Sequence, residues 1–226
     1  MSYAMYLKKE VIDVDKNQTY LLNLHKQTDN EIEKLRPFAE ENQVPIVDKL
    51  SLDMIKQLIR VHCPKHILEI GTAIGYSAMQ FASVNEQIHV TTIERDEKMQ
   101  RLSKQHVTQF GYDGQITLVQ GDALEQFENV STHSYDMIFI DAAKAQSKKF
   151  FELYSPLLNE QGMVITDNVL YHGFVADIDV VRSRNVKQMV KKVQQYNEWL
   201  MNHPDFVTNF LNIDDGLAIS IKGESK

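Results

Sequence analysis

Two polar groups directly follow apolar runs, and their side chains are of the types that bind a hard metal ion. Asp141 comes after the apolar run at 135–140, and Asp167 and Asn168 follow the run at 162–166. Carboxylates placed directly after buried strands are costly unless they bind something. Two carboxylates and an amide oxygen suit Mg²⁺ or Mn²⁺, whereas Zn²⁺ prefers His or Cys. The alternative is that Asp141 caps a helix and that Asp167 and Asn168 form a turn.

A second group of residues suits a nucleoside cofactor. Gly71, in the segment Glu-Ile-Gly-Thr-Ala-Ile-Gly-Tyr-Ser at 69–77, allows a sharp turn where a Cβ would collide with a ligand. The dinucleotide pattern Gly-x-Gly-x-x-Gly is absent because position 73 is Ala, which favours a cofactor without phosphates. Glu94 can accept both hydroxyls of a ribose, and Asp122 can accept a hydrogen bond from an adenine amino group. The alternatives are an ordinary strand-to-helix turn, a surface acid and a helix cap.

The surrounding pattern predicts a sheet that brings these residues to one edge. Short apolar runs predict strands at 67–70, 88–93, 116–119, 135–140 and 162–166, and helical spacing predicts helices at 76–84, 96–110 and 144–158. Strands that alternate with helices imply a parallel sheet covered on both faces, with ligands bound at the carboxyl ends of its strands. After a basic helix at 184–202, an Asp-Gly turn separates apolar runs at 206–213 and 217–221, which predicts an antiparallel hairpin. We therefore expect a Rossmann-like α/β fold with a mostly parallel seven-stranded sheet.

The first fifty residues differ from the rest in their pattern. Apolar residues at helical spacing between 17 and 41 predict one or two amphipathic helices, and Pro37 and Pro45 interrupt that pattern. Ser51 is expected to cap the following helix. We expect a single domain over residues 1–226, in which 1–50 form a helical extension and 51–226 form the Rossmann-like core.

The composition limits the class of protein. Of the 226 residues, 43% are hydrophobic and 24% are charged, which are ordinary globular values. The net charge of -7 argues against a protein that binds nucleic acid over its whole surface, although a local basic patch is compatible with it. The lone Cys63 excludes an intrachain disulfide and suits a reducing compartment. We expect a cytoplasmic protein, because residues 1–15 do not resemble a secretory signal and no apolar stretch is long enough to span a membrane.

The motifs LEIGTAIGYSAMQFA, TTIERDEKM, GDALE, FIDAAKAQ and TDNVLYHG, in this order, resemble the metal-dependent O-methyltransferases of the catechol and caffeoyl-CoA type. The resemblance covers residues 44–221 and implies a class I methyltransferase fold and, as in that family, a homodimer. It also implies a binding site for S-adenosylmethionine, formed by Glu69, Gly71, Ser77, Glu94, Asp122, Ala123 and Asp141. The implied metal ligands are Asp141, Asp167 and Asn168, and the implied catalytic residues are Lys144 and Asp141.

The chemistry of methyl transfer agrees with these roles. A metal dication lowers the pKa of a bound hydroxyl and fixes its position, so that the oxyanion attacks the sulfonium methyl in line. Lys144 follows Asp141 by one helical turn, and a nearby dication should lower its pKa and help it to act as a base. The alternative for Lys144 is a solvated helix residue.

The segments TDNVLYHGFVAD and RSRNVKQMVKKVQQYNEWL most resemble the bacterial branch that converts 5-hydroxyuridine to 5-methoxyuridine at position 34 of the tRNA anticodon loop. The 5-hydroxyl and 4-carbonyl of that base form a two-oxygen chelate like that of a catechol. Aromatic side chains at 171–174 could stack on a flipped base. A cluster of basic residues could hold phosphates of the anticodon stem-loop, namely Arg182, Arg184, Lys187, Lys191 and Lys192.

Two other functions are compatible with the sequence. A small-molecule O-methyltransferase of the catechol or caffeoyl-CoA type would use the same catalytic residues, with the basic helix merely solvated. A non-catalytic partner subunit that binds S-adenosylmethionine is less compatible with the intact set of Asp141, Lys144, Asp167 and Asn168.

Overall fold

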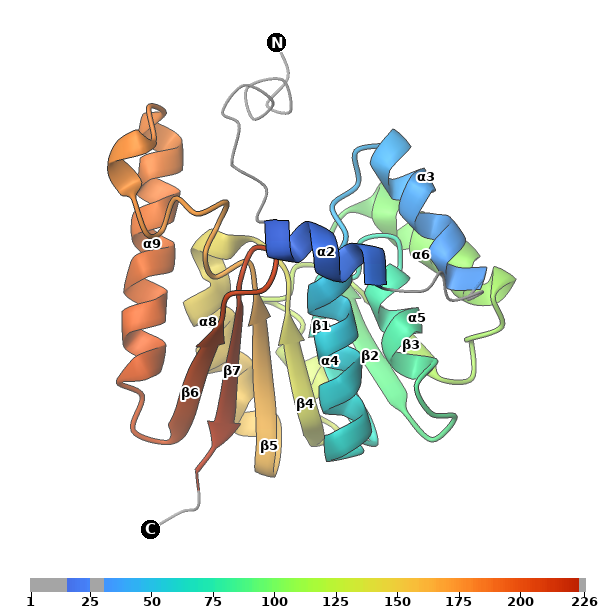
Figure 1. Ribbon diagram of the computed structural model, residues 1–226. Coiled ribbons are helices and arrows are strands. Elements are labelled where there is room, and N and C mark those ends of the chain that lie inside the picture. Colours follow the sequence, from blue (N-terminus) through green and yellow to red (C-terminus); the bar gives the residue numbers. More distant parts are fainter. Residues whose placement is uncertain (1–15, 25–30, 224–226) are drawn as a thin grey trace.

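The structure is a computed structural model that describes residues 16–24 and 31–223. Within this part, seven strands form one sheet, namely β1 (His66–Ile70), β2 (His89–Glu94), β3 (Ile116–Gln120), β4 (Tyr135–Ile140), β5 (Leu158–Asp167), β6 (Phe206–Leu211) and β7 (Leu217–Lys222). Their order across the sheet is β3-β2-β1-β4-β5-β7-β6 (Figure 1). The first five strands are parallel, and β7 runs antiparallel to both β5 and β6. The predicted α/β fold and its antiparallel end are therefore confirmed.

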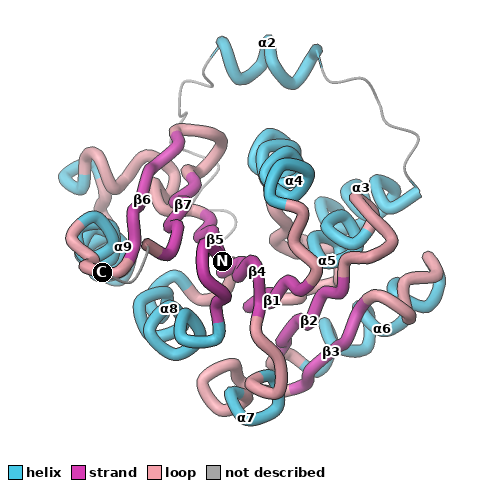
Figure 2. Tube along the Cα trace, turned by 90° about the horizontal axis from the view of Figure 1, so that it is seen from below, coloured by secondary structure: helices cyan, strands magenta, loops and turns pink. Residues whose placement is uncertain are grey.

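Helices cover both faces of this sheet (Figure 2). The described helical elements are α2 (Lys16–Leu24), η1 (Glu31–Lys34), α3 (Leu35–Glu41), α4 (Lys49–His62), α5 (Tyr76–Ala82), α6 (Glu97–Gln109), α7 (Phe127–Val130), η2 (Lys144–Gln146), α8 (Ser147–Tyr154), η3 (Ser155–Leu157), η4 (Ile178–Val180) and α9 (Arg184–Met201). None of those described helices is long and apolar enough to cross a membrane.

The core consists of two apolar layers, one on each face of the sheet. Alternate residues of each strand point into one layer or the other. Successive side chains of a strand point to opposite faces, so Ile67 of β1 packs with α3, α4, α5 and α6, whereas Leu68 packs with α7, α8 and α9. Ile32 and Leu35 of the N-terminal extension lie in the first layer together with the sheet residues. The N-terminal extension therefore packs against the same apolar core as the strands of the sheet.

Three local predictions were wrong for physical reasons. Pro37 lies in the first turn of α3 rather than interrupting it, because a residue there needs no N–H for the helix. Ser51 lies inside α4, whose N-cap residue is Asp48, and the Ser51 N–H donates instead to Asp214 at 2.7 Å. The helix predicted at 144–158 is divided into η2, α8 and η3.

The strand predicted at 162–166 is longer than expected. β5 begins at Leu158, which pairs with Tyr135 of β4. The next pair along the two strands is Met137 with Met163, so the pairing register shifts between Tyr135 and Met137. The extra residues form a bulge, which apolar spacing does not reveal. The other end of β5 still stops at the residue that matters for the site, Asp167.

Candidate active site

A cavity of about 700 Å³ lies at the carboxyl ends of the parallel strands. Most of the predicted site residues line it, namely Gly71, Ser77, Glu94, Asp122, Ala123, Asp141, Lys144, Asp167 and Asn168. The loops after β1 to β5 supply these residues, as expected for a parallel sheet. A segment of the N-terminal extension, residues 42–48, forms a further wall.

Gly71 lets the turn after β1 approach β4 closely. Its φ of +106° is rare for other residues, and a Cβ at this position would lie 2.2 Å from the carbonyl oxygen of Asp141. The Asp141 N–H donates to the Ile70 carbonyl at 3.0 Å, which holds the ends of the two strands together. The glycine therefore brings the turn after β1 next to Asp141, the first of the predicted metal ligands.

Glu94 fixes the same loop from β2. Its Oε2 accepts the Ala73 N–H at 2.8 Å, and its Oε1 accepts the N–H groups of Arg95 and Asp96 at 2.9 and 2.8 Å. A carboxylate has about four lone-pair sites, so capacity is left for a hydroxyl donor in the cavity. Asp122 similarly accepts the Leu124 N–H at 2.9 Å, but it does so in a turn at 123–125 rather than as a helix cap, because α7 begins later with Gln126 as its N-cap residue. Both acids therefore shape their loops while still lining the cavity.

Glu69 lies outside the cavity lining, contrary to its predicted role as a cofactor-binding residue. Its side chain is fully buried in β1 and accepts a hydrogen bond from the Thr92 hydroxyl at 2.5 Å. Burial raises the pKa of Glu69 to about 7, although hydrogen bonds from Ser77 and Thr92 act in the opposite direction. Glu69 therefore holds Ser77, at the start of α5, and Thr92 of β2 by hydrogen bonds, and it does not line the cavity.

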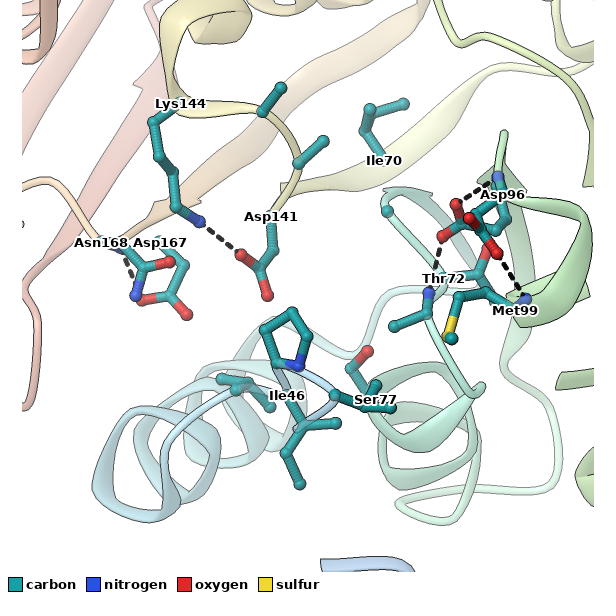
Figure 3. Close-up of a pocket in the computed structure, with 18 of the residues that line it drawn as sticks. Ile46, Ile70, Thr72, Ser77, Asp96, Met99, Asp141, Lys144, Asp167 and Asn168 are labelled. Atoms are coloured by element: carbon teal, nitrogen blue, oxygen red, sulfur yellow. Dashed lines mark hydrogen bonds and ion pairs between the residues drawn. The ribbon is translucent and has the colours of Figure 1, made fainter. Parts of the chain in front are cut away.

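The predicted metal ligands come together at the other end of the cavity. Figure 3 shows Lys144 pointing to Asp141, with Asp167 and Asn168 beside them. The Lys144 Nζ lies 2.7 Å from Asp141 Oδ1, and the Asn168 N–H donates to Asp167 Oδ1 at 2.7 Å. Asn168 has a φ of 60°, a left-handed conformation that Asn tolerates better than most residues.

The second oxygen of Asp167 is free to bind a ligand in the cavity. Asp167 is 3% exposed, and its Oδ2 has no hydrogen-bond partner among the described residues. Burial, and then the charge of Asp141, hold the pKa of Asp167 well above its usual value. In the described part of the chain, no three His, Cys, Asp or Glu side chains form a metal-binding group. A site here therefore needs the amide of Asn168, which suits the oxygen-ligand cations expected from the sequence.

Lys144 is held in its charged form by its neighbours. Burial lowers its pKa, but the carboxylates of Asp141 and Asp167 outweigh burial and keep the pKa above its usual value. The lowered pKa that the sequence suggested therefore requires the positive charge of a bound cation beside these acids.

Sequence reasoning missed two parts of the cavity wall. Residues 42–48 line it, although no motif marks them, because they are placed only when the extension packs on the core. Asp215 also lines it, and its carboxylate accepts the N–H of His172 in the loop after β5. The Asp-Gly signal predicted the hairpin turn but gave no sign that this turn would reach the loop after β5.

The basic residues in the first half of α9 and just before it lie outside the cavity lining. Arg182, Arg184, Lys191 and Lys192 are exposed and Lys187 is half-buried. Figure 1 shows α9 beside β6, with its first turns toward the sheet edge at which β4 and β5 end. The cluster therefore lies at the same end of the molecule as the cavity, on its outer surface.

The fold and the cavity define a Rossmann-like protein with a pocket at the carboxyl edge of its sheet. Residues 12–223 match the O-methyltransferase family, and the chain belongs to this family. It is therefore an enzyme that transfers a methyl group to an oxygen atom, as predicted.

Similar proteins support this assignment. A Staphylococcus aureus protein described as a candidate caffeoyl-CoA O-methyltransferase has 67% identity and a TM-score of 0.89, over 92% of this chain and 100% of that one. A catechol O-methyltransferase from Niastella koreensis is 30% identical over 75% of this chain and 77% of its own length. The O-methyltransferase TomG from Streptomyces achromogenes, solved in complex with SAM, shares the fold with 23% identity and a TM-score of 0.77, over 92% of this chain and 96% of that one.

Proposed function

We propose that this chain transfers the methyl group of S-adenosylmethionine to one of two adjacent oxygens of an acceptor, with a divalent cation beside them. The observation that carries the proposal is the unpartnered Oδ2 of buried Asp167, next to Asp141 and Asn168 in the cavity. Mg²⁺ or Mn²⁺ held by these three residues would lower the pKa of a bound hydroxyl and orient it.

The cofactor would lie at the end of the cavity formed by the turns after β1, β2 and β3. Glu94 would accept hydrogen bonds from the ribose hydroxyls, and Asp122 would accept one from the adenine amino group. Gly71 would shape this end of the cavity, because the lack of a Cβ lets the turn after β1 pack against the Asp141 backbone. TomG, which shares the fold, was solved in complex with SAM, and this supports S-adenosylmethionine as the cofactor.

Lys144 would receive the proton of the acceptor hydroxyl. Its Nζ already lies at hydrogen-bond distance from Asp141, so it stands beside the proposed metal ligands. Asp141 would hold Lys144 in place, and the walls of the cavity would align the oxygen with the methyl group. Because attack of an oxyanion on a sulfonium neutralises both charges, this alignment contributes more than further charge stabilisation.

The acceptor favoured by the comparisons is a small phenol. The relatives are described as catechol and caffeoyl-CoA O-methyltransferases, and none of these names points to the tRNA 5-hydroxyuridine predicted from the sequence. The tRNA substrate stays a second candidate because the exposed basic residues of α9 lie at the cavity end of the molecule. Both acceptors present two adjacent oxygens to the same cation.

The experiment compares the purified protein with its Asp167→Ala variant, using S-adenosylmethionine, Mg²⁺ and three acceptors. These are catechol, caffeoyl-CoA and an anticodon stem-loop that carries 5-hydroxyuridine. We expect Mg²⁺-dependent methylation that the variant loses. Methylation that persists in the variant, or after chelation of the metal, would contradict the proposal.

A charge variant separates the two acceptor classes. Replacing Arg184, Lys187 and Lys191 by Gln should weaken binding of the stem-loop and flatten its dependence on salt. The same variant should leave methylation of catechol unchanged, because these residues lie outside the cavity lining. Stem-loop affinity that is insensitive to this variant would exclude the basic cluster as its binding surface.

A further inference from the structure

The cavity is strongly acidic at the end where the acceptor would bind. Among the described residues, seven carboxylates and two cationic side chains line it. Four of these carboxylates interact electrostatically around Lys144, namely Asp48, Asp141, Asp167 and Asp215. A divalent cation would offset two of these four negative charges. Lys144 is uncharged until it receives the proton of the acceptor, so two negative charges remain when the acceptor binds.

Asp48 is held in place by its backbone while its carboxylate stays open to the cavity. It is the N-cap residue of α4, and its carbonyl accepts the Leu52 N–H at 2.9 Å. On the other side, Arg36 donates to the Val47 carbonyl at 3.2 Å. Its carboxylate makes no capping hydrogen bond within the described chain. The backbone therefore holds residue 48 in position, but the Asp48 side chain does not cap α4.

The surroundings of Asp48 show that its charge acts on the same region. Removal from bulk water, and then the charges of Asp214 and Asp215, raise the pKa of Asp48 above its usual value. Arg36 partly offsets these effects, and the charge of Asp141 adds to them. The Asp48 carboxylate and the proposed metal ligands therefore share one electrostatic environment.

The carboxylate of Asp215, unlike that of Asp48, contacts another described residue, His172. One oxygen accepts the N–H of His172, and the other lies 3.6 Å from His172 Nδ1. The Asp215 carbonyl also accepts the Leu170 N–H at 2.9 Å, so the residue holds the loop that follows the metal ligands. Asp48 is consequently the better position at which to test charge without disturbing that loop.

We propose that Asp48 is a specificity-determining residue that makes the acceptor end of the cavity favour neutral or cationic acceptors over acceptors with an anionic group near the reacting oxygens. The inference rests on the proposed function and deepens it by defining the charge class of the acceptor. Asp48 is exposed and lines the cavity, so its charge acts on the acceptor through a field that water partly screens.

The test uses three catechols that share the reacting oxygens but differ in charge: catechol, dopamine and 3,4-dihydroxybenzoate. Each is compared in the parent protein, in Asp48→Asn and in the control Asp53→Asn. Asp53 is also on α4 but lies outside the cavity lining. Asn is a good N-cap residue, so Asp48→Asn should retain α4, which a thermal melt checks.

For Asp48→Asn, we expect kcat/KM for the anionic catechol to rise about tenfold relative to that for the cationic catechol, as removal of one charge at cavity distance predicts. Dissociation constants, measured by calorimetry with Mg²⁺ and S-adenosylhomocysteine, should change in the same ratio. Asp53→Asn should leave both ratios as in the parent protein.

The two proposals fail in different ways. If the catechols are methylated but Asp48→Asn leaves the charge ratios unchanged, the inference is wrong and the proposed function stands. If no catechol is methylated, the small-phenol acceptor is wrong, and the dissociation constants alone decide the inference. Absence of catechol binding in every protein would overturn the inference as well.

Discussion

Replacing Glu69 by Gln tests how a fully buried carboxyl group beneath the cofactor loop affects stability. Burial raises its pKa from 4.5 to about 7 in the folded protein. Between these values the folded state binds more protons than the unfolded state, so stability falls as pH rises through this window. At about 1.4 kcal/mol for each pKa unit, the parent protein should lose about 3 kcal/mol between about pH 5 and pH 8 through this residue.

The amide of Gln resembles the protonated acid in shape and carries no charge, so the Glu69→Gln variant should lack this loss. The assay is urea unfolding of both proteins at about pH 5 and pH 8, with the free energy of unfolding compared between them. Other titrating groups affect both proteins equally and cancel in the difference. The variant should therefore gain about 3 kcal/mol relative to the parent on going from acid to alkaline pH.

The control is Glu86→Gln, because Glu86 is an exposed carboxyl in a surface turn. It should show the pH dependence of the parent protein. The reasoning would be refuted if Glu69→Gln also kept that pH dependence, within about 0.5 kcal/mol. That result would mean that burial does not raise the pKa of the Glu69 carboxyl group.

Three further predictions concern the cavity. Gly71→Ala should destabilise the protein by about 3 kcal/mol in urea unfolding, because its Cβ would lie 2.2 Å from the Asp141 carbonyl oxygen; unchanged stability would contradict the turn described. Asp167→Asn should stabilise the metal-free protein in a thermal melt, since it removes a buried carboxyl group whose Oδ2 has no hydrogen-bond partner and whose charge is repelled by Asp141, but should abolish stabilisation by Mg²⁺. Asn197→Leu should weaken Mg²⁺ binding in calorimetry, because Asn197 donates to the Val169 carbonyl at 2.8 Å beside the metal ligands; unchanged affinity would show that this anchor is dispensable.

Much of the fold could be predicted because parallel strands and covering helices have different apolar periods. The buried runs at 67–70 and 135–140 stop where β1 and β4 stop, so Gly71 and Asp141, which follow them, fell on the correct edge of the sheet. Predictions failed where a local feature overrode periodicity. The bulge in β5 and the short α7 leave no repeat long enough to detect.

The candidate site could be predicted to the same extent as the fold. Residues that follow a strand directly, such as Asp141 and Asp167, were placed by the sheet itself. Asp48 and Asp215 reach the cavity through packing of the extension and of the hairpin turn, which local patterns do not encode. Glu69 differs from these residues, because the motif grouped it with the cofactor-binding residues but it is buried in β1, outside the cavity lining. The predicted homodimer and the tRNA contacts stay predictions.

The central claim is that Asp141, Asp167 and Asn168 hold one divalent cation beside the methyl donor. The most direct measurement is a crystal structure of the protein with Mn²⁺ and S-adenosylhomocysteine, in which anomalous scattering locates the ion. The account predicts one strong peak coordinated by oxygens of all three side chains, next to the sulfur of the cofactor product. A cofactor-bound structure with no peak there, or with the ion on other residues, would contradict it.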